Sequence, residues 1–264
     1  MPDYNEAMSV ETAKVALVTG ASKGIGKVIA IELGRAGYDV AVNYNTDRAG
    51  AEATVKGIEE LGRRAVALQA DVGDIRSARG LFTQLDRHFS DLNVVVANAA
   101  VQTWKPLLDL TIEEWDRVQN TNLRGTFLCT QEGAKRMVSK GHGGSIITIG
   151  STCNKLAFPR LVDYTASKGG IEMFTKVAAV ELGRYQIRVN CVAPGATEVE
   201  RTKAETGDYA GTWAPLTPLG RIGYPIDIAR AVLFFAGEQS EFVTGQTLYV
   251  DGGVGARPHW PYEL

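Results

Sequence analysis

Seven short apolar runs rich in β-branched residues recur along the chain, and most of them are separated by a segment long enough for a helix. Segments 24–36, 47–61 and 74–89 are three such helical patterns. Strands that are joined by helical crossovers lie parallel and are covered on both faces. We therefore expect one α/β domain, a doubly wound fold with a seven-stranded parallel sheet flanked by helices. The strands are predicted at 15–20, 40–44, 65–70, 94–98, 145–150, 187–192 and 247–250.

The charge balance and the cysteines exclude several classes of protein. The 264 residues include 28 basic and 30 acidic side chains. This balance gives no excess of positive charge for binding nucleic acid or an anionic membrane, so we expect neither as a partner. No stretch approaches the roughly 18 apolar residues of a membrane span. Cys129, Cys153 and Cys191 lack the spacing of a disulfide framework or a zinc site. We expect a cytoplasmic enzyme with reduced thiols and no metal.

The predicted domain lies between a flexible N-terminal arm and a C-terminal tail, with the three parts at 1–12, 13–255 and 256–264. Within the domain, 196–218 is the longest stretch without a clear periodicity. Stretches of that length in a compact domain are usually functional lids or disordered segments. Because Tyr209 and Trp213 give this one apolar surface, we predict a lid that closes on a bound ligand.

Three glycines follow the first predicted strand and lead directly into a helical pattern. Gly20 permits a tight turn, Gly24 lets backbone N–H groups approach a pyrophosphate, and Gly26 allows the helix to pack closely on the strand. The alternative is that the glycines only form the turn between strand and helix. The position after the first of seven strands favours a dinucleotide site.

Tyr164 and Lys168 are four residues apart in a helical pattern, which places them on one helix face. A nearby ammonium favours the tyrosinate, so the pair can move a proton, although surface Tyr–Lys pairs are also common. Ser151 ends the fifth strand, where open α/β sheets bind ligands, and Thr152 is the rival hydroxyl. Asn122 lies inside a helical pattern, where asparagine is unfavourable unless it has a role or simply faces solvent.

The ordered motifs of the chain resemble those of the short-chain dehydrogenases/reductases. The glycine turn has their T-G-x-x-x-G-x-G spacing, and further matches are Asp71, ANAA at 97–100, Asn122, Ser151, Tyr164-Thr-Ala-Ser-Lys168, Pro194-Gly195, 218–229 and 243–253. The resemblance implies a Rossmann fold, hydride transfer between a nicotinamide and a substrate carbon, and a catalytic set of Asn122, Ser151, Tyr164 and Lys168. It also implies that Asn122 holds a water linked to Lys168. The chain departs from the family at Ala97, Ala100 and Asn93, which we expect to affect the scaffold around the adenine and ribose.

The end of the second strand indicates which nicotinamide binds. Members of the family that prefer NAD usually carry an aspartate there, whereas this chain has Tyr44. The neighbouring side chains Asn43, Asn45 and Thr46 are neutral, and Lys23 can meet a 2′-phosphate. We expect NADP(H), with NAD(H) as a possible second cofactor. The predicted cofactor contacts are Gly20, Ser22, Lys23, Gly24, Ile25, Gly26, Tyr44, Asn45, Asp71, Val72, Asn98, Ala99, Tyr164, Lys168, Pro194, Gly195 and Thr197.

The substrate is a small molecule, and the nearest resemblance is to bacterial glucose 1-dehydrogenases, which implies a sugar, a polyol or a small ketone. Reduction of a 3-oxoacyl thioester is the second hypothesis, since the reductases of 3-oxoacyl-acyl-carrier-protein share these motifs. A nicotinamide-nucleotide-sensing binding protein and a structural role are the alternatives from other classes. The predicted substrate contacts are Trp104, Ser151, Cys153, Phe158, Leu161, Tyr164, Tyr209 and Trp213.

The family and the apolar helices together predict a homotetramer. The helical patterns around Asn122 and Tyr164 carry more apolar side chains than one sheet face can bury, and closed two-fold assemblies are a common way to cover such helices. The apolar side chains of these two patterns include Phe127, Leu128, Met137, Met173, Phe174 and Val177, and some of them should meet another subunit. In the tail, Trp260 and Tyr262 are predicted to pack on a neighbour.

Overall fold

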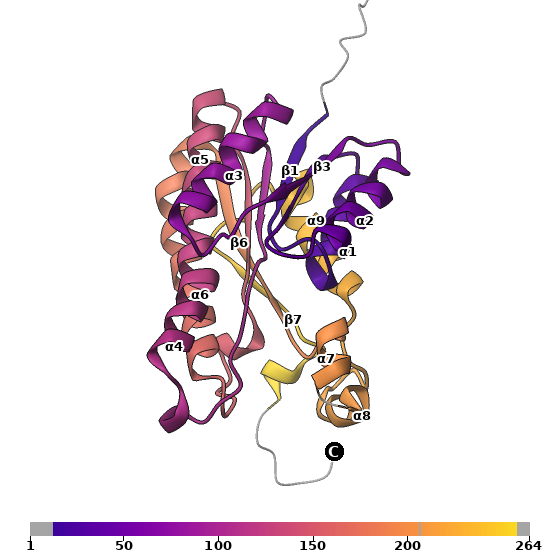
Figure 1. Ribbon diagram of the computed structural model, residues 1–264, viewed down its shortest axis with the longest axis vertical. Helices are drawn as coiled ribbons and strands as arrows, with labels where there is room; N and C mark the ends of the chain where they lie inside the picture. Colours follow the sequence, from indigo (N-terminus) through magenta and orange to yellow (C-terminus); the bar gives the residue numbers. More distant parts are fainter. Residues whose placement is uncertain (1–12, 206, 258–264) are drawn as a thin grey trace, which may run out of the picture.

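The seven predicted strands are confirmed, each within two residues of its predicted ends, in a computed structural model that describes residues 13–205 and 207–257 (Figure 1). They are β1 (Val15–Val18), β2 (Asp39–Tyr44), β3 (Ala65–Gln69), β4 (Val94–Ala97), β5 (Gly144–Ile149), β6 (Ile187–Pro194) and β7 (Thr247–Val250). They form one sheet in the order β3-β2-β1-β4-β5-β6-β7, and every neighbouring pair is parallel. The chain therefore has the doubly wound fold that the sequence predicts.

Helices cover the sheet on both faces, as Figure 1 shows. One layer consists of α1 (Gly24–Arg35), α2 (Arg48–Glu59) and α9 (Pro225–Ala236). The other consists of α3 (Ile75–His88), α5 (Gly125–Lys140) and α6 (Val162–Leu182). Each layer encloses its own cluster of buried apolar side chains, which explains why a central strand such as β1 is apolar at every position.

Helix α3 illustrates how the sequence specifies these layers. Its buried side chains are Ala78, Leu81, Phe82 and Leu85, spaced so that they form one stripe on a helix. The helix begins where the Asp74 carboxylate accepts a hydrogen bond of 2.8 Å from the Ser77 N–H. The polar remainder of the helix faces outward, so one face packs on the sheet.

The strand order reverses beside β1, which pairs with β2 on one side and with β4 on the other. Loops leave the carboxyl ends of β1 and β4 in opposite directions, and a crevice opens between these two strands. Ligands of open α/β sheets bind in such a crevice. The fold thus places the glycine turn after β1 and the residues after β4 and β5 at one edge of the sheet.

In two segments the helices of the structure differ from what the sequence pattern indicates. The stretch at 111–139 is not one regular helix, because a π-helical turn at Gln119–Arg124 separates α4 (Ile112–Val118) from α5. The predicted lid contains two short helices, α7 (Glu200–Glu205) and α8 (Tyr209–Trp213), which are too short to give a periodicity.

Segments 1–12 and 258–264, with the predicted arm and the tail residues Trp260 and Tyr262, lie outside the described residues. Within the described ranges, the helices are all too short or too polar to cross a membrane.

Candidate active site

The glycine turn is packed too tightly for other residues. A Cβ on Gly26 would lie 2.3 Å from the Gly20 carbonyl oxygen and 2.5 Å from Asn98 Nδ2. Gly20 and Gly24 have φ angles of +62° and +56°, which other L-residues adopt at a cost. Helix α1 begins at Gly24, and the side chain of its N-cap residue, Lys23, makes no capping hydrogen bond. The first N–H groups of the helix are therefore available to an anion.

A threonine that sequence analysis did not single out holds the turn in place. Thr19 Oγ1 accepts hydrogen bonds of 2.9 and 3.0 Å from the backbone N–H groups of Asn98 and Ala99. In return, Asn98 Nδ2 donates to the carbonyl oxygens of Thr19 and Gly20, at 2.8 and 3.2 Å. The Asn98 amide thus binds the scaffold of the turn. Asn98 lies beside the glycine motif because β4 pairs with β1, and the sequence alone does not give this strand order.

The end of β2 differs from its predicted role at one residue. Asn43, grouped with the neutral side chains around the cofactor, is buried and acts within the protein. Its Oδ1 accepts a 3.2 Å hydrogen bond from the Gly20 N–H, and its Nδ2 donates to the backbone of the neighbouring strand. Tyr44 is only 6% exposed and packs in the cluster beneath α1 and α2. Lys23, Asn45 and Thr46 are the exposed side chains of this region.

Asp71 and Val72 follow β3 and border the same edge. Asp71 Oδ1 accepts a 2.8 Å hydrogen bond from the Gly73 N–H, and the Asp71 N–H donates to Ser77 Oγ at 2.8 Å. The Val72 side chain is buried. On the far side, Gly195 packs so closely on Asp251 that a Cβ would lie 2.6 Å from its Cα, and Thr197 Oγ1 donates to the Gly195 carbonyl at 3.1 Å.

A cavity of about 600 Å³ lies at this edge, beside the glycine turn. It brings together all eight predicted substrate contacts, the catalytic Lys168 and five predicted cofactor contacts. These are Trp104, Ser151, Cys153, Phe158, Leu161, Tyr164, Tyr209 and Trp213, with Ile25, Asn98, Pro194, Gly195 and Thr197. Sequence analysis missed Gln102, Arg201 and Thr202, which also line it and belong to no motif.

Ser151 and Tyr164 come from consecutive segments that meet in the cavity. Ser151 leaves β5 in an extended conformation, and its Oγ accepts a 3.2 Å hydrogen bond from the Cys153 N–H. A hydrogen bond also joins the side chains of Ser151 and Tyr164. Thr152, the rival hydroxyl, is buried and donates to the Pro194 carbonyl at 3.2 Å. Of the two hydroxyls, it is therefore that of Ser151 that interacts with the Tyr164 phenol.

The charge state of Tyr164 differs from the expectation. Burial raises the pKa of Tyr164 to about 12, and the hydrogen bond with Ser151 and the charge of Arg201 only partly oppose this effect. The sequence suggested that Lys168 lowers this pKa. Desolvation of the phenolate is the largest effect, and the charge that opposes it is that of Arg201 rather than that of Lys168, so the phenol carries its proton at neutral pH.

Lys168 lies one turn further along α6 and is 2% exposed. Its Nζ is 5.5 Å from the centroid of the Tyr164 ring and donates a 2.6 Å hydrogen bond to the Ile149 carbonyl. Burial lowers the pKa of Lys168 to about 8. The positive charge of Lys168 is thus lost only slightly above neutral pH.

Asn122 lies in the π-helical turn and is buried rather than facing solvent. Its side chain bonds the backbone of Val101, accepting from the N–H at 2.8 Å and donating to the carbonyl at 2.9 Å. Its Nδ2 also donates to Ser167 Oγ at 3.0 Å, and Ser167 lies beside Lys168 on α6. Asn122 therefore connects the loop after β4 to the catalytic helix.

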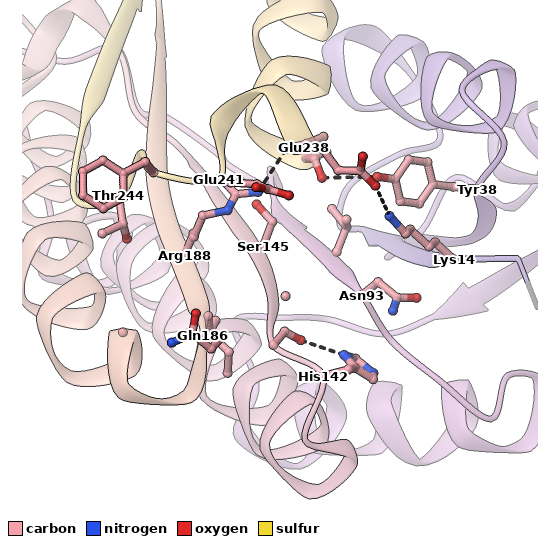
Figure 2. A pocket seen from close by; sticks show the side chains of 18 residues that line it. Lys14, Tyr38, Asn93, His142, Ser145, Gln186, Arg188, Glu238, Glu241 and Thr244 are labelled. Atoms are coloured by element: carbon pink, nitrogen blue, oxygen red, sulfur yellow. Dashed lines mark hydrogen bonds and ion pairs between the residues drawn. The ribbon is translucent and has the colours of Figure 1, made fainter.

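The opposite edge of the sheet holds a second cavity, of about 700 Å³ (Figure 2). Its charged groups pair within the protein: Lys14 Nζ lies 3.1 Å from Glu238, and Arg188 donates to Ser240 Oγ at 2.9 Å. Asn93 lines this cavity, where its Oδ1 accepts from the Val15 N–H at 2.7 Å. The expected effect of Asn93 on the adenine end is therefore wrong, because the residue immediately precedes β4, at the far edge of the sheet. None of the predicted catalytic residues lines this cavity.

Among the described residues, no group of three His, Cys, Asp or Glu side chains is arranged to hold a metal ion.

Comparisons with known proteins agree with this geometry. A family model described as enoyl-(acyl carrier protein) reductase matches residues 20–255. A short-chain dehydrogenase/reductase of Pestalotiopsis microspora is 42% identical over 255 residues, which cover 91% of this chain and 94% of the relative. The 3-oxoacyl-[acyl-carrier-protein] reductase of Staphylococcus aureus is 38% identical, over 93% of this chain and 99% of that one.

Solved structures support the same assignment. A short-chain type dehydrogenase/reductase of Mycobacterium marinum superposes with a TM-score of 0.87 at 35% identity, over 91% of this chain and 95% of that chain. The family as a whole uses a nicotinamide cofactor. The chain therefore belongs to the short-chain dehydrogenase/reductase family, whose enzymes act on carbonyl and alcohol groups.

Proposed function

We propose that the chain is an NADP(H)-dependent oxidoreductase that interconverts a carbonyl and an alcohol, with Tyr164 as the general acid and base. One observation carries this proposal: Ser151, Tyr164 and Lys168 line the same cavity, beside a glycine turn suited to a dinucleotide. A phenol, a hydroxyl and an amine at this edge can bind a carbonyl oxygen and move a proton to it.

The residues at the sheet edge fit a dinucleotide. The close approach at Gly26 and the uncapped start of α1 would receive the pyrophosphate. Asp71 and Val72 would border the adenosine, and Ile25, Asn98, Pro194, Gly195 and Thr197 would surround the other end, next to Tyr164. When bound, the nicotinamide supplies or accepts the hydride.

Tyr164 and Ser151 act on the substrate oxygen. At neutral pH the phenol is protonated, because burial raises its pKa to about 12, so it can donate both a hydrogen bond and a proton to an incoming carbonyl. The Ser151 hydroxyl, bonded to the same phenol, can donate to the second lone pair of that oxygen. In the reverse direction Tyr164 removes the proton of the alcohol.

Lys168 stabilises the phenolate that forms during reduction. Its ammonium lies close to the Tyr164 ring and is fixed by the Ile149 carbonyl. Because the pKa of Lys168 is about 8, the stabilising charge is present at neutral pH and is lost above it. Asn122 positions this helix through Ser167 and, by family resemblance, holds a water linked to Lys168.

The preference for NADP(H) rests on the exposed side chains near the end of β2. Lys23 precedes α1 and is exposed, and Asn45 and Thr46 add neutral hydrogen-bonding groups. A 2′-phosphate would meet a cation and no carboxylate at the position of Tyr44. NAD(H) lacks that phosphate and would bind more weakly.

Two substrate classes follow from the sequence: a sugar, polyol or small ketone, and a 3-oxoacyl thioester. The second is favoured by the relative from Staphylococcus aureus, which is named as a 3-oxoacyl-[acyl-carrier-protein] reductase. A nicotinamide-sensing binding protein would be identified by the absence of cofactor turnover with any carbonyl. Ser151, Tyr164 and Lys168 all line one cavity, which argues against that alternative.

We also propose that the chain forms a homotetramer through α5 and α6. Met173, Val177 and Val180 form an exposed stripe along α6, and the Phe127 and Phe174 rings meet edge to face with centroids 6.2 Å apart. This stripe offers apolar surface to a neighbouring copy. Leu128 and Met137, which belong to the same apolar set in the sequence, are buried in the core under α5.

A cytoplasmic location is part of the proposal. Cys129, Cys153 and Cys191 are free buried thiols, as expected in a reducing compartment.

Replacing Tyr164 by Phe removes the transferable proton while the ring keeps its shape. We expect turnover of a carbonyl substrate to fall about a thousandfold, with the dissociation constant of NADPH nearly unchanged. Tyr185→Phe, at a surface tyrosine, is the matched control and should keep full turnover. Retention of a tenth of the activity in Tyr164→Phe would contradict the acid–base role.

Lys168 imposes a pH dependence on folding stability. Its folded pKa of about 8 lies below its ordinary value of 10.5, so folding favours the neutral amine and the free energy of unfolding rises with pH. Relative to Lys168→Met, the wild type should gain about 2 kcal/mol between pH 8 and pH 10. Urea unfolding of both proteins across this range measures the difference. Equal slopes would show that Lys168 is not desolvated as described.

Replacing Lys23 by Ala should weaken NADPH binding about tenfold and leave NADH binding nearly unchanged, because only NADPH carries the 2′-phosphate. Lys27→Ala, one turn into α1, is the control. Dissociation constants from cofactor fluorescence measure both effects. Equal losses for the two cofactors would remove Lys23 from the phosphate site.

Val180 is 84% exposed, so glutamate at this position should be harmless to an isolated subunit. If α6 forms the interface, Val180→Glu should convert the tetramer to dimers or monomers in sedimentation at micromolar concentration. Ile75→Glu, at an exposed apolar residue of α3, should leave the assembly intact. An unchanged tetramer in Val180→Glu would place the interface elsewhere.

A further inference from the structure

Four aromatic side chains from three separate segments line the substrate side of the cavity. Trp104 follows β4, Phe158 lies between β5 and α6, and Tyr209 and Trp213 belong to α8. Trp104 is 58% exposed, although tryptophan is costly to leave in water. Segments so distant in sequence have converged on one volume, and their rings form its walls.

The rings are inclined to one another rather than stacked. The centroids of Phe158 and Trp213 are 5.8 Å apart with an interplanar angle of 68°, and those of Tyr209 and Trp213 are 6.3 Å apart at 49°. Edge contacts of this kind fix the orientation of each ring. A flat guest with its own π-system can add further edge-to-face or offset contacts to such a group.

Four polar side chains of the cavity form hydrogen bonds within the protein itself. Thr152 and Thr197 donate to the carbonyls of Pro194 and Gly195. Asn98 Nδ2 donates to the glycine turn, and Thr202 Oγ1 donates to the Val199 carbonyl at 2.9 Å. A sugar would bring several hydroxyls into a site with few partners for them, and each unpaired hydroxyl costs free energy.

The charges of the cavity determine which aromatic guest can enter. Lys168 and Arg201 are cationic, and none of the described residues that line the cavity is an aspartate or glutamate. The Arg201 charge acts on both Tyr164 and Tyr209 by opposing the rise in their pKa values. Although aromatic cages also bind cations, the two positive groups here would repel one. A neutral or anionic guest is compatible with them.

We propose that the substrate is a planar aromatic ketone, neutral or anionic, whose ring system lies against Phe158, Tyr209 and Trp213 while its carbonyl oxygen reaches Ser151 and Tyr164. This inference rests on the proposed carbonyl reduction and narrows its substrate class. The sugar and the small aliphatic ketone lack the ring that the walls would contact.

A pair of bicyclic ketones isolates the aromatic contribution. 2-Tetralone and 2-decalone share one carbon skeleton and one carbonyl position, and only 2-tetralone carries an aromatic ring. We expect kcat/KM with NADPH to be about tenfold higher for 2-tetralone, as a few aromatic contacts would give. Trp213→Leu should bring the ratio of the two kcat/KM values close to one, and Trp213→Phe should keep most of it.

Phe242→Leu is the matched control, because Phe242 is an exposed aromatic residue of the opposite cavity and should leave the ratio unchanged. Unfolding midpoints of all variants show whether each one folds. A ratio near one in the wild type, or an unchanged ratio in folded Trp213→Leu, would overturn the aromatic assignment. Turnover of diacetyl or D-fructose, but of neither bicyclic ketone, would overturn it while the proposed function stands. Absence of NADPH oxidation with every carbonyl would refute the proposed function instead.

Discussion

The close contact between α1 and the end of β1 is the constraint on which the site depends. Only a glycine at position 26 lets the helix start against the Gly20 carbonyl and the Asn98 amide. Because Thr19 and Asn98 tie β1 to β4 at this point, the crevice beside β1 has a fixed width. Asn43 adds a third connection, from β2 to the Gly20 N–H. The dinucleotide site is thus built from backbone geometry that three buried polar side chains hold in place.

Burial of the catalytic groups gives them their charge states. The same low-polarity surroundings raise the pKa of Tyr164 to about 12 and lower that of Lys168 to about 8, which moves the two values further apart than in water. The phenol keeps a proton to donate, and the ammonium remains charged only up to slightly alkaline pH. This arrangement costs stability, because Lys168 is desolvated and its ammonium donates to a backbone acceptor, the Ile149 carbonyl. Asn122 supports α6 by donating a hydrogen bond to Ser167 Oγ.

The strands could be predicted, and the candidate catalytic residues could be proposed, because each leaves a local signal: an apolar run, a glycine spacing or a pair at i and i+4. Residues that act through the tertiary fold left no such signal. Asn43 and Arg201 gain their positions from the strand order or from the lid, which a linear pattern does not contain. The π-helical turn around Asn122 and the short helices of the lid were not predicted, because none of them spans enough residues to establish a periodicity. The sequence also did not separate Leu128 and Met137, which are buried, from the exposed Phe127 on the same helix, because an apolar helix does not reveal which of its faces meets the sheet.

Isotope transfer tests hydride chemistry in this cavity most directly. The protein would be incubated with a ketone that it consumes and with NADPH carrying deuterium in the transferable position at C4, and the alcohol analysed by mass spectrometry and NMR. Direct reduction predicts one deuterium on the carbinol carbon and a solvent-derived proton on its oxygen, with the transfer lost in Tyr164→Phe. Oxidation of the cofactor without deuterium in the alcohol, or equal transfer in the variant, would contradict the mechanism.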